Sequence, residues 1–62
     1  MNPLFAAALR YAELGYRVFP CAPGSKEPLT ERGFHDASTD IGVIESWWHF
    51  HPSANVAVAT EG

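Results

Sequence analysis

The first twenty residues place a helix pattern directly before a strand pattern, and this junction constrains the fold more than any other feature. Apolar side chains recur at the spacing of one helix face, at Phe5, Ala8, Leu9 and Ala12. Asn2 suits the N-cap, Pro3 suits the first helical position, and Gly15 suits the left-handed residue that ends a helix. The β-branched and aromatic run 16–20 then predicts a strand that Pro20 ends. We therefore predict a helix over residues 3–14 and a strand over 16–20.

The second half of the chain repeats this order after a long irregular stretch, residues 22–38. Thr39 or Asp40 is the expected N-cap of a second helix. Its apolar residues have helical spacing, at Ile41, Ile44, Trp47 and Trp48, and the helix should end near Phe50, before Pro52. Residues 55–60 predict a second strand. The fold class is α/β, with the order α-β-loop-α-β. Because a helix joins the two strands, we expect a right-handed crossover and a short, parallel two-stranded sheet.

A chain of 62 residues forms at most one domain and buries a small core. Two helices cannot cover both faces of a sheet, and each face of the second strand is apolar, with Val56 and Val58 on one side and Ala57 and Ala59 on the other. We expect the chain to be weakly stable or to associate through its sheet edge, as a symmetric homodimer.

Composition excludes several classes of protein. The formal net charge is -3 with only four Lys and Arg, so no basic field spreads over the whole chain. Cys21 is the single cysteine, which excludes an internal disulfide. The apolar run Leu4–Leu9 is far shorter than a membrane span of about 20 residues, and no basic segment of a signal peptide precedes it. We expect a cytoplasmic protein with no membrane partner.

No side chains of this sequence form a convincing metal site. The internal carboxylates Asp36, Asp40 and Glu45 fall at a helix start or on its surface, where Asp40 is more simply a cap. His49 and His51 lie about 200° apart on a helix, so they cannot hold one ion together while the helix continues. We predict no metal ligand and no catalytic residue among these side chains.

The aromatic residues are better explained by packing than by stacking on bases. Trp47 and Trp48 lie three and four residues after Ile44, so at least one should belong to the core. Phe34 interrupts the long loop, and we expect it to anchor the loop on the core.

Five blocks of this sequence together resemble one family. They are AALRYAELGYRVFP, PGSKEPLTERGF, DASTD, IESWW and HPSANVAVATEG, in that order. The chain resembles the N-terminal part of the bifunctional DNA primase/polymerase (prim-pol) domain of the archaeo-eukaryotic primase superfamily. The resemblance covers nearly all of residues 1–62.

The resemblance implies a longer α+β catalytic domain that makes primers and extends DNA, with nucleoside triphosphates and a DNA template as partners and divalent metal (Mg or Mn) as cofactor. In the family, acidic motifs hold the metal ions, and the first of them follows the turn after a strand like NVAVAT. No residue here matches those motifs. The expectation is therefore a scaffold segment, inactive by itself and without a cofactor of its own, that needs the C-terminal part of the same domain.

Lys26 is the main candidate for binding nucleotide or nucleic acid. It stands in a Gly-Ser-Lys-x-Pro loop after a strand, from which an ammonium reaches a phosphate, and the family has a Lys-x-Pro at this place. The motif is not a Walker A loop, and a solvated loop lysine is the plain alternative. Arg32 shares the hypothesis with less support. A rival function is a non-catalytic interaction module that folds on pairing its strands with a partner or a second copy.

Overall fold

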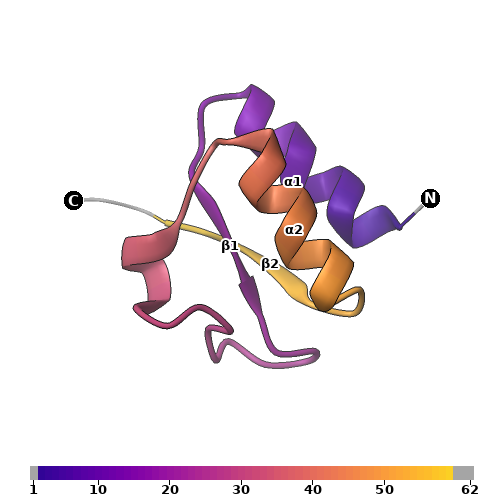
Figure 1. Ribbon diagram of the computed structural model, residues 1–62, viewed down its shortest axis with the longest axis vertical. Coiled ribbons are helices and arrows are strands. Elements are labelled where there is room, and N and C mark those ends of the chain that lie inside the picture. The colour runs from indigo at the N-terminus through magenta and orange to yellow at the C-terminus, as the bar shows by residue number, and fades with distance from the viewer. Residues whose placement is uncertain (1, 60–62) are drawn as a thin grey trace.

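The computed structural model describes residues 2–59 as two helices packed on one side of a small sheet (Figure 1). In chain order the elements are helix α1 (Pro3–Glu13), strand β1 (Val18–Cys21), a short 3-10 helix η1 (Gly33–Asp36), helix α2 (Ile41–Phe50) and strand β2 (Asn55–Val58). The predicted helices are confirmed to within one residue. The strands are shorter than predicted, and β1 begins two residues late and includes Cys21.

Both helices begin at side chains that cap them. The Asn2 carboxamide oxygen accepts the amide of Leu4 at 2.9 Å, and the Asp40 carboxylate accepts the amide of Gly42 at 2.9 Å. Such caps satisfy backbone donors that have no partner within the helix. After α1, Gly15 has a φ of 92°, a left-handed conformation that a glycine adopts without strain. The expected caps at both helix starts and the turn at Gly15 are confirmed.

The two strands run antiparallel, so the predicted parallel sheet is wrong. Val18 lies opposite Val58, and Cys21 lies opposite Asn55. The crossover rule applies when the connecting helix carries the chain from the end of one strand back to the level where that strand began. Here the loop 22–38 already brings the chain back to the start of β1, before α2 begins. Its last residues reach the start of β1, where Val18 and Ser38 exchange two backbone hydrogen bonds of 3.0 and 2.9 Å.

Helix α2 therefore starts at the same end of the sheet as β1. The four residues 51–54 then turn the chain back into β2, which runs in the opposite direction to β1 (Figure 1). A short connection of this kind leaves no length for a second crossing of the sheet. The α/β composition of the fold is confirmed, and only the direction of pairing changes.

The core lies between the helices and the face of the sheet that they cover. It consists of buried Ala8, Ala12, Val18, Ile44, Trp48 and Ala54, with Val56 and Val58 half-buried against them. The small alanines of α1 allow close packing of the helix on the sheet. Trp48 also donates its indole N–H to the carbonyl of Ala54 at 3.1 Å, which ties α2 to the turn before β2. The prediction that at least one tryptophan is core is confirmed.

Backbone contacts, and not the ring of Phe34, hold the long loop. Phe34 is 49% exposed and stacks on His35 at 4.3 Å between ring centroids, so the expected anchor on the core is wrong. The loop is bound along β1 instead, where the amide of Leu29 donates to Pro20 at 2.9 Å and Ser38 pairs with Val18. Within residues 2–59, no helix has the length and apolar character that crossing a membrane requires.

Candidate functional site

A hollow of about 340 Å³ lies where the turn after β1 meets β2. We call it the turn hollow, and its lining residues are Phe19, Cys21, Ser25, Lys26, Asn55, Val56 and Ala57. Phe19 and Ala57 are opposite each other in the sheet, as are Cys21 and Asn55, so the antiparallel register brings the two ends of the lining together. Only a strand pairing of this direction places the Lys26 turn beside the start of β2.

Lys26 is held at the rim of the turn hollow by a compact turn. The amide of Ala22 donates to the carbonyl of Glu27 at 2.8 Å, and the amide of Ser25 donates to Ala22 at 3.0 Å. The Ser25 hydroxyl accepts the amide of Glu27 at 3.0 Å. Gly24 has a φ of 68°, which the tight reversal requires. These three hydrogen bonds and the conformation of Gly24 hold the backbone on both sides of Lys26, while the side chain of Lys26 stays exposed.

The lining is apolar and neutral apart from one cation. Among its residues only Lys26 carries a charge, and the hydroxyl of Ser25 and the carboxamide of Asn55 add hydrogen-bonding groups. Cys21 is buried, and burial raises the pKa of its thiol, so that the thiol stays protonated and acts as a small apolar wall. The arrangement suits an anion whose charge lies at the rim beside the ammonium.

Arg32, the second predicted binding residue, lies outside this lining. Its guanidinium contacts Asp36 at 2.9 Å, and its backbone amide donates to the same carboxylate at 2.9 Å. The backbone amide of Arg32 is the main cause that lowers the pKa of Asp36, with smaller contributions from the guanidinium and from His35. The structure thus does not bring Arg32 and Lys26 together on one hollow, and Arg32 is occupied within its own loop.

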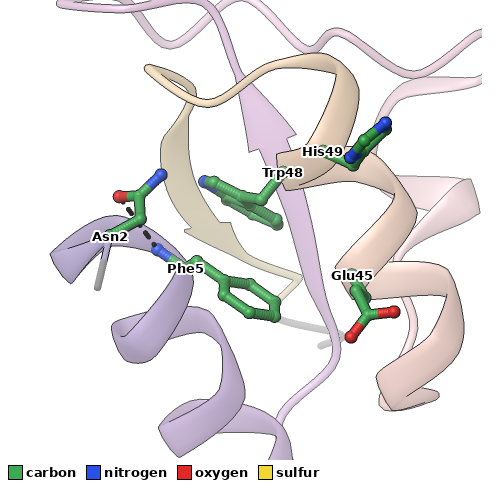
Figure 2. Close-up of a pocket in the computed structure, with 5 residues that line it drawn as sticks. All are labelled: Asn2, Phe5, Glu45, Trp48 and His49. Carbon is green, nitrogen blue, oxygen red and sulfur yellow. Dashed lines mark hydrogen bonds between the residues drawn. The ribbon is translucent and has the colours of Figure 1, made fainter.

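The remaining acidic and histidine side chains are placed as surface groups or caps. Asp40 caps α2, and His51 is exposed. Glu45 and His49 border a second hollow of about 220 Å³ between the start of α1 and α2, whose other lining residues are Asn2, Phe5 and Trp48 (Figure 2). No group of three or more His, Cys, Asp or Glu that could hold a metal ion occurs within residues 2–59.

Two groups at these hollows escaped the sequence analysis. Asn55 lines the turn hollow only because of its antiparallel pairing with Cys21, which a parallel sheet would not give. Asn2 was identified as a cap, but its carboxamide also donates to the carbonyl of Pro52 at 2.6 Å. That bond links the first and the last thirds of the chain, and no local pattern signals a contact across 50 residues.

The comparison with protein-family models agrees with the resemblance of the five sequence blocks. The family model described as bifunctional DNA primase/polymerase, N-terminal, matches residues 8–62. The comparisons with curated proteins and with solved structures find no match. The family match spans far more than half of the chain, from within α1 through β2, and it includes the turn that carries Lys26. The chain therefore belongs to the bifunctional DNA primase/polymerase family, as a form of its N-terminal region.

Proposed function

We propose that this chain is the N-terminal scaffold of a domain that synthesises primers and extends DNA by nucleotidyl transfer, and that its turn hollow receives a phosphate group. The phosphate belongs to a nucleoside triphosphate or to the backbone of the DNA template. The observation that carries the proposal is Lys26, whose backbone is held in a compact turn at the rim of an otherwise neutral hollow. Family membership supplies the general role in DNA priming and polymerisation.

The shape and chemistry of the turn hollow favour this ligand class. An ammonium is a compact point charge that binds phosphate oxygens from many directions. Phe19 and Ala57 provide apolar surface on which the uncharged part of a nucleotide can lie, as ligand sites generally combine apolar walls with a few polar groups. The rigid backbone around Lys26 reduces the entropy lost on binding.

The divalent metal of nucleotidyl transfer is, in this proposal, held by carboxylates other than those described here. Two-metal catalysis needs acidic side chains converging on ions about 4 Å apart. Asp36 is engaged by Arg32, and Asp40 accepts the amides of Gly42 and Val43. Neither Asp36 nor Asp40 is available without breaking a local structure, which supports the roles of loop contact and helix cap for these two residues.

The test is a binding titration of the 62-residue chain with two probes, a deoxynucleoside triphosphate and a short single-stranded oligonucleotide. Amide resonances of Ser25, Lys26 and Ala57 should shift in a saturable way with at least one probe. Lys26→Ala should weaken that binding about tenfold, the size expected for one charge-assisted contact. The circular dichroism spectrum should not change, because the Lys26 side chain is exposed.

Arg10→Ala is the matched control, since Arg10 is also exposed and lies in the last turn of α1. It removes the same charge from the chain and should leave the affinity unchanged. Equal weakening by both substitutions would indicate attraction by net charge alone and would refute a specific phosphate site. If neither probe binds at millimolar concentration, the result would favour the rival function, a non-catalytic interaction module.

A further inference from the structure

The polar side chains that line the turn hollow share one property, which is that their acceptor atoms are already engaged. The backbone amide of Glu27 donates to the hydroxyl oxygen of Ser25 at 3.0 Å. The backbone amide of Val56 donates to the carboxamide oxygen of Asn55 at 3.1 Å. The third polar group, the ammonium of Lys26, has hydrogen-bond donors and no acceptor. The side chains of the hollow therefore have only donors left to offer to a ligand.

The hydrogen bond from Val56 also decides which way the carboxamide of Asn55 is turned. A backbone amide can only donate, so the side-chain atom that faces it is the oxygen, and the NH2 group lies on the other side of the carboxamide. Asn55 is exposed, and no acceptor for this NH2 group occurs within residues 2–59. Two N–H donors are thus unused at the wall of the turn hollow.

The sheet register brings these donors to the same side as the Lys26 turn. Successive side chains of a strand point to opposite faces, so Asn55 lies on the face of β2 opposite to Val56, which packs toward the helices. Asn55 lies opposite Cys21 in the ladder. The thiol of Cys21 in turn donates to the carbonyl of Lys26 at 3.7 Å. A continuous row of contacts therefore connects the turn that carries the ammonium with the carboxamide on β2.

We propose that Asn55 is the second ligand-binding residue of the turn hollow, and that its NH2 group donates to an oxygen of the phosphate whose charge Lys26 neutralises. This inference rests on the proposed function and deepens it, because it names the residue that gives the site its preference. The hydroxyl hydrogen of Ser25 is a third donor to the same group. The ligand class is an ionised phosphate, either a phosphodiester or a phosphate of a nucleoside triphosphate.

Asn55 contributes what the ammonium alone lacks. An ammonium is a point charge that attracts any anion from many directions, whereas the two N–H bonds of a carboxamide have fixed directions. An ionised phosphate oxygen accepts such bonds, and a phosphodiester has no hydrogen to donate in return. A ligand group that must itself donate finds no unengaged side-chain acceptor in this lining, and an unpaired donor lowers affinity. The hollow should therefore prefer groups that only accept.

Asn55→Asp is the sharpest test, because it keeps the shape of the side chain and the oxygen that accepts the amide of Val56. It replaces only the NH2 group, by an anionic oxygen. Asn55→Ala removes both functions. The unchanged 62-residue chain and both variants are titrated with inorganic tripolyphosphate and, separately, with a short single-stranded oligonucleotide. The probe that binds tells a triphosphate from a phosphodiester.

The side-chain NH2 resonances of Asn55 should shift in a saturable way with the bound probe. Asn55→Ala should weaken binding about tenfold, and Asn55→Asp should weaken it more, because an anion then faces the phosphate. Ser53→Asp is the matched control for charge. Ser53 is exposed in the turn 51–54 and lies outside the lining, so this substitution adds the same negative charge and should leave the affinity unchanged.

The outcomes separate the role of Asn55 from that of the hollow. If Asn55→Asp binds as tightly as the unchanged chain while Lys26→Ala binds weakly, Asn55 is no ligand contact and the phosphate site stands. Equal weakening by Asn55→Asp and Ser53→Asp would reduce the effect to net charge and overturn the inference. Failure of the unchanged chain to bind either probe overturns the phosphate site and the role of Asn55 together. If a variant at position 55 does not fold, the Asn55 resonances of the unchanged chain decide, and an unshifted NH2 group at saturation overturns the inference.

Discussion

Trp48 and Trp47 offer a test of the core in which the same substitution is made at neighbouring positions. Trp48 is 4% exposed and donates its indole N–H to Ala54, whereas Trp47 is half-buried and makes no indole hydrogen bond within the described residues. Phenylalanine keeps an aromatic ring at either position but removes the N–H and one ring of the indole. We expect Trp48→Phe to be much more damaging than Trp47→Phe.

The magnitude follows from two losses at Trp48. The carbonyl of Ala54 loses its donor in a buried site, which costs about 1–3 kcal/mol. The smaller ring also leaves unfilled volume in the core, for which about 1 kcal/mol is a reasonable addition. A chain of this length is stabilised by roughly 3–9 kcal/mol in total. Trp48→Phe should therefore remove about 2–4 kcal/mol, and Trp47→Phe less than about 1 kcal/mol.

Urea unfolding followed by far-ultraviolet circular dichroism measures the difference, and the remaining tryptophan provides a second probe by fluorescence. In a thermal melt, at a scale of about 4–8 °C per kcal/mol for domains of this size, Trp48→Phe should lower the melting temperature by about 8–32 °C. Equal losses for the two variants would refute the assignment of Trp48 as the link between α2 and the turn before β2. A larger loss of stability for Trp47→Phe would mean that α2 buries the face that carries Trp47 and not the face that carries Trp48.

Three further predictions concern a cap, an ion pair and a thiol. Asp40→Ala should lower the free energy of unfolding by about 1 kcal/mol, and Asp40→Asn should restore most of it, because an Asn side chain also caps. Carbon-detected NMR should find the pKa of Asp36 below its usual range, so its contribution to stability is present at neutral pH and is lost as the pH falls through that lowered value. Arg32→Ala should raise this pKa only partly, since the backbone amide of residue 32 is its main cause. Iodoacetamide should modify Cys21 slowly in the folded chain and quickly in urea, because burial protects the thiol and raises its pKa; equal rates would contradict the buried position.

The local elements of this fold were predictable because their signals are local. Asn2 and Asp40 each stand beside the amides that they cap, and Gly15 needs only its own φ to end a helix. Ile44 and Trp48 repeat at the spacing of one helix face, which brings both to the core. These features depend on neighbours within four residues, so the sequence pattern is sufficient to place them.

The direction of the sheet was not predictable in the same way, because it depends on where a loop without periodicity goes. Two backbone hydrogen bonds between Val18 and Ser38 decide it, and no side chain signals them. The same limitation applies to Phe34, whose apolar side chain suggested an anchor although Leu29 and Ser38 hold the loop through their backbones. Backbone pairing of irregular segments is invisible to patterns of side-chain polarity.

The candidate site contains one residue that a local pattern predicted and one that depends on the pairing of distant segments. Lys26 was found because the turn chemistry of Gly24 and Ser25 follows directly on a strand, and the structure places it at the rim of the turn hollow. Asn55 was not found because it comes 29 positions later and reaches the hollow only through its pairing with Cys21. When two distant segments form a site, the site can be predicted from the sequence only if the pairing of those segments is predicted correctly.

The loop 22–38 determines both the turn hollow and the edge of the sheet at which β1 is covered. By returning to Ser38 it occupies the outer side of β1, and by turning tightly at Gly24 it raises Lys26 beside the start of β2. Lys26→Ala breaks none of the backbone hydrogen bonds that hold the turn or the register of the two strands, so it should weaken phosphate binding and leave hydrogen exchange of the Ala59 amide, which donates to Arg17, unchanged. Faster exchange of that amide in Lys26→Ala would mean that the Lys26 side chain supports the fold and is not reserved for a ligand.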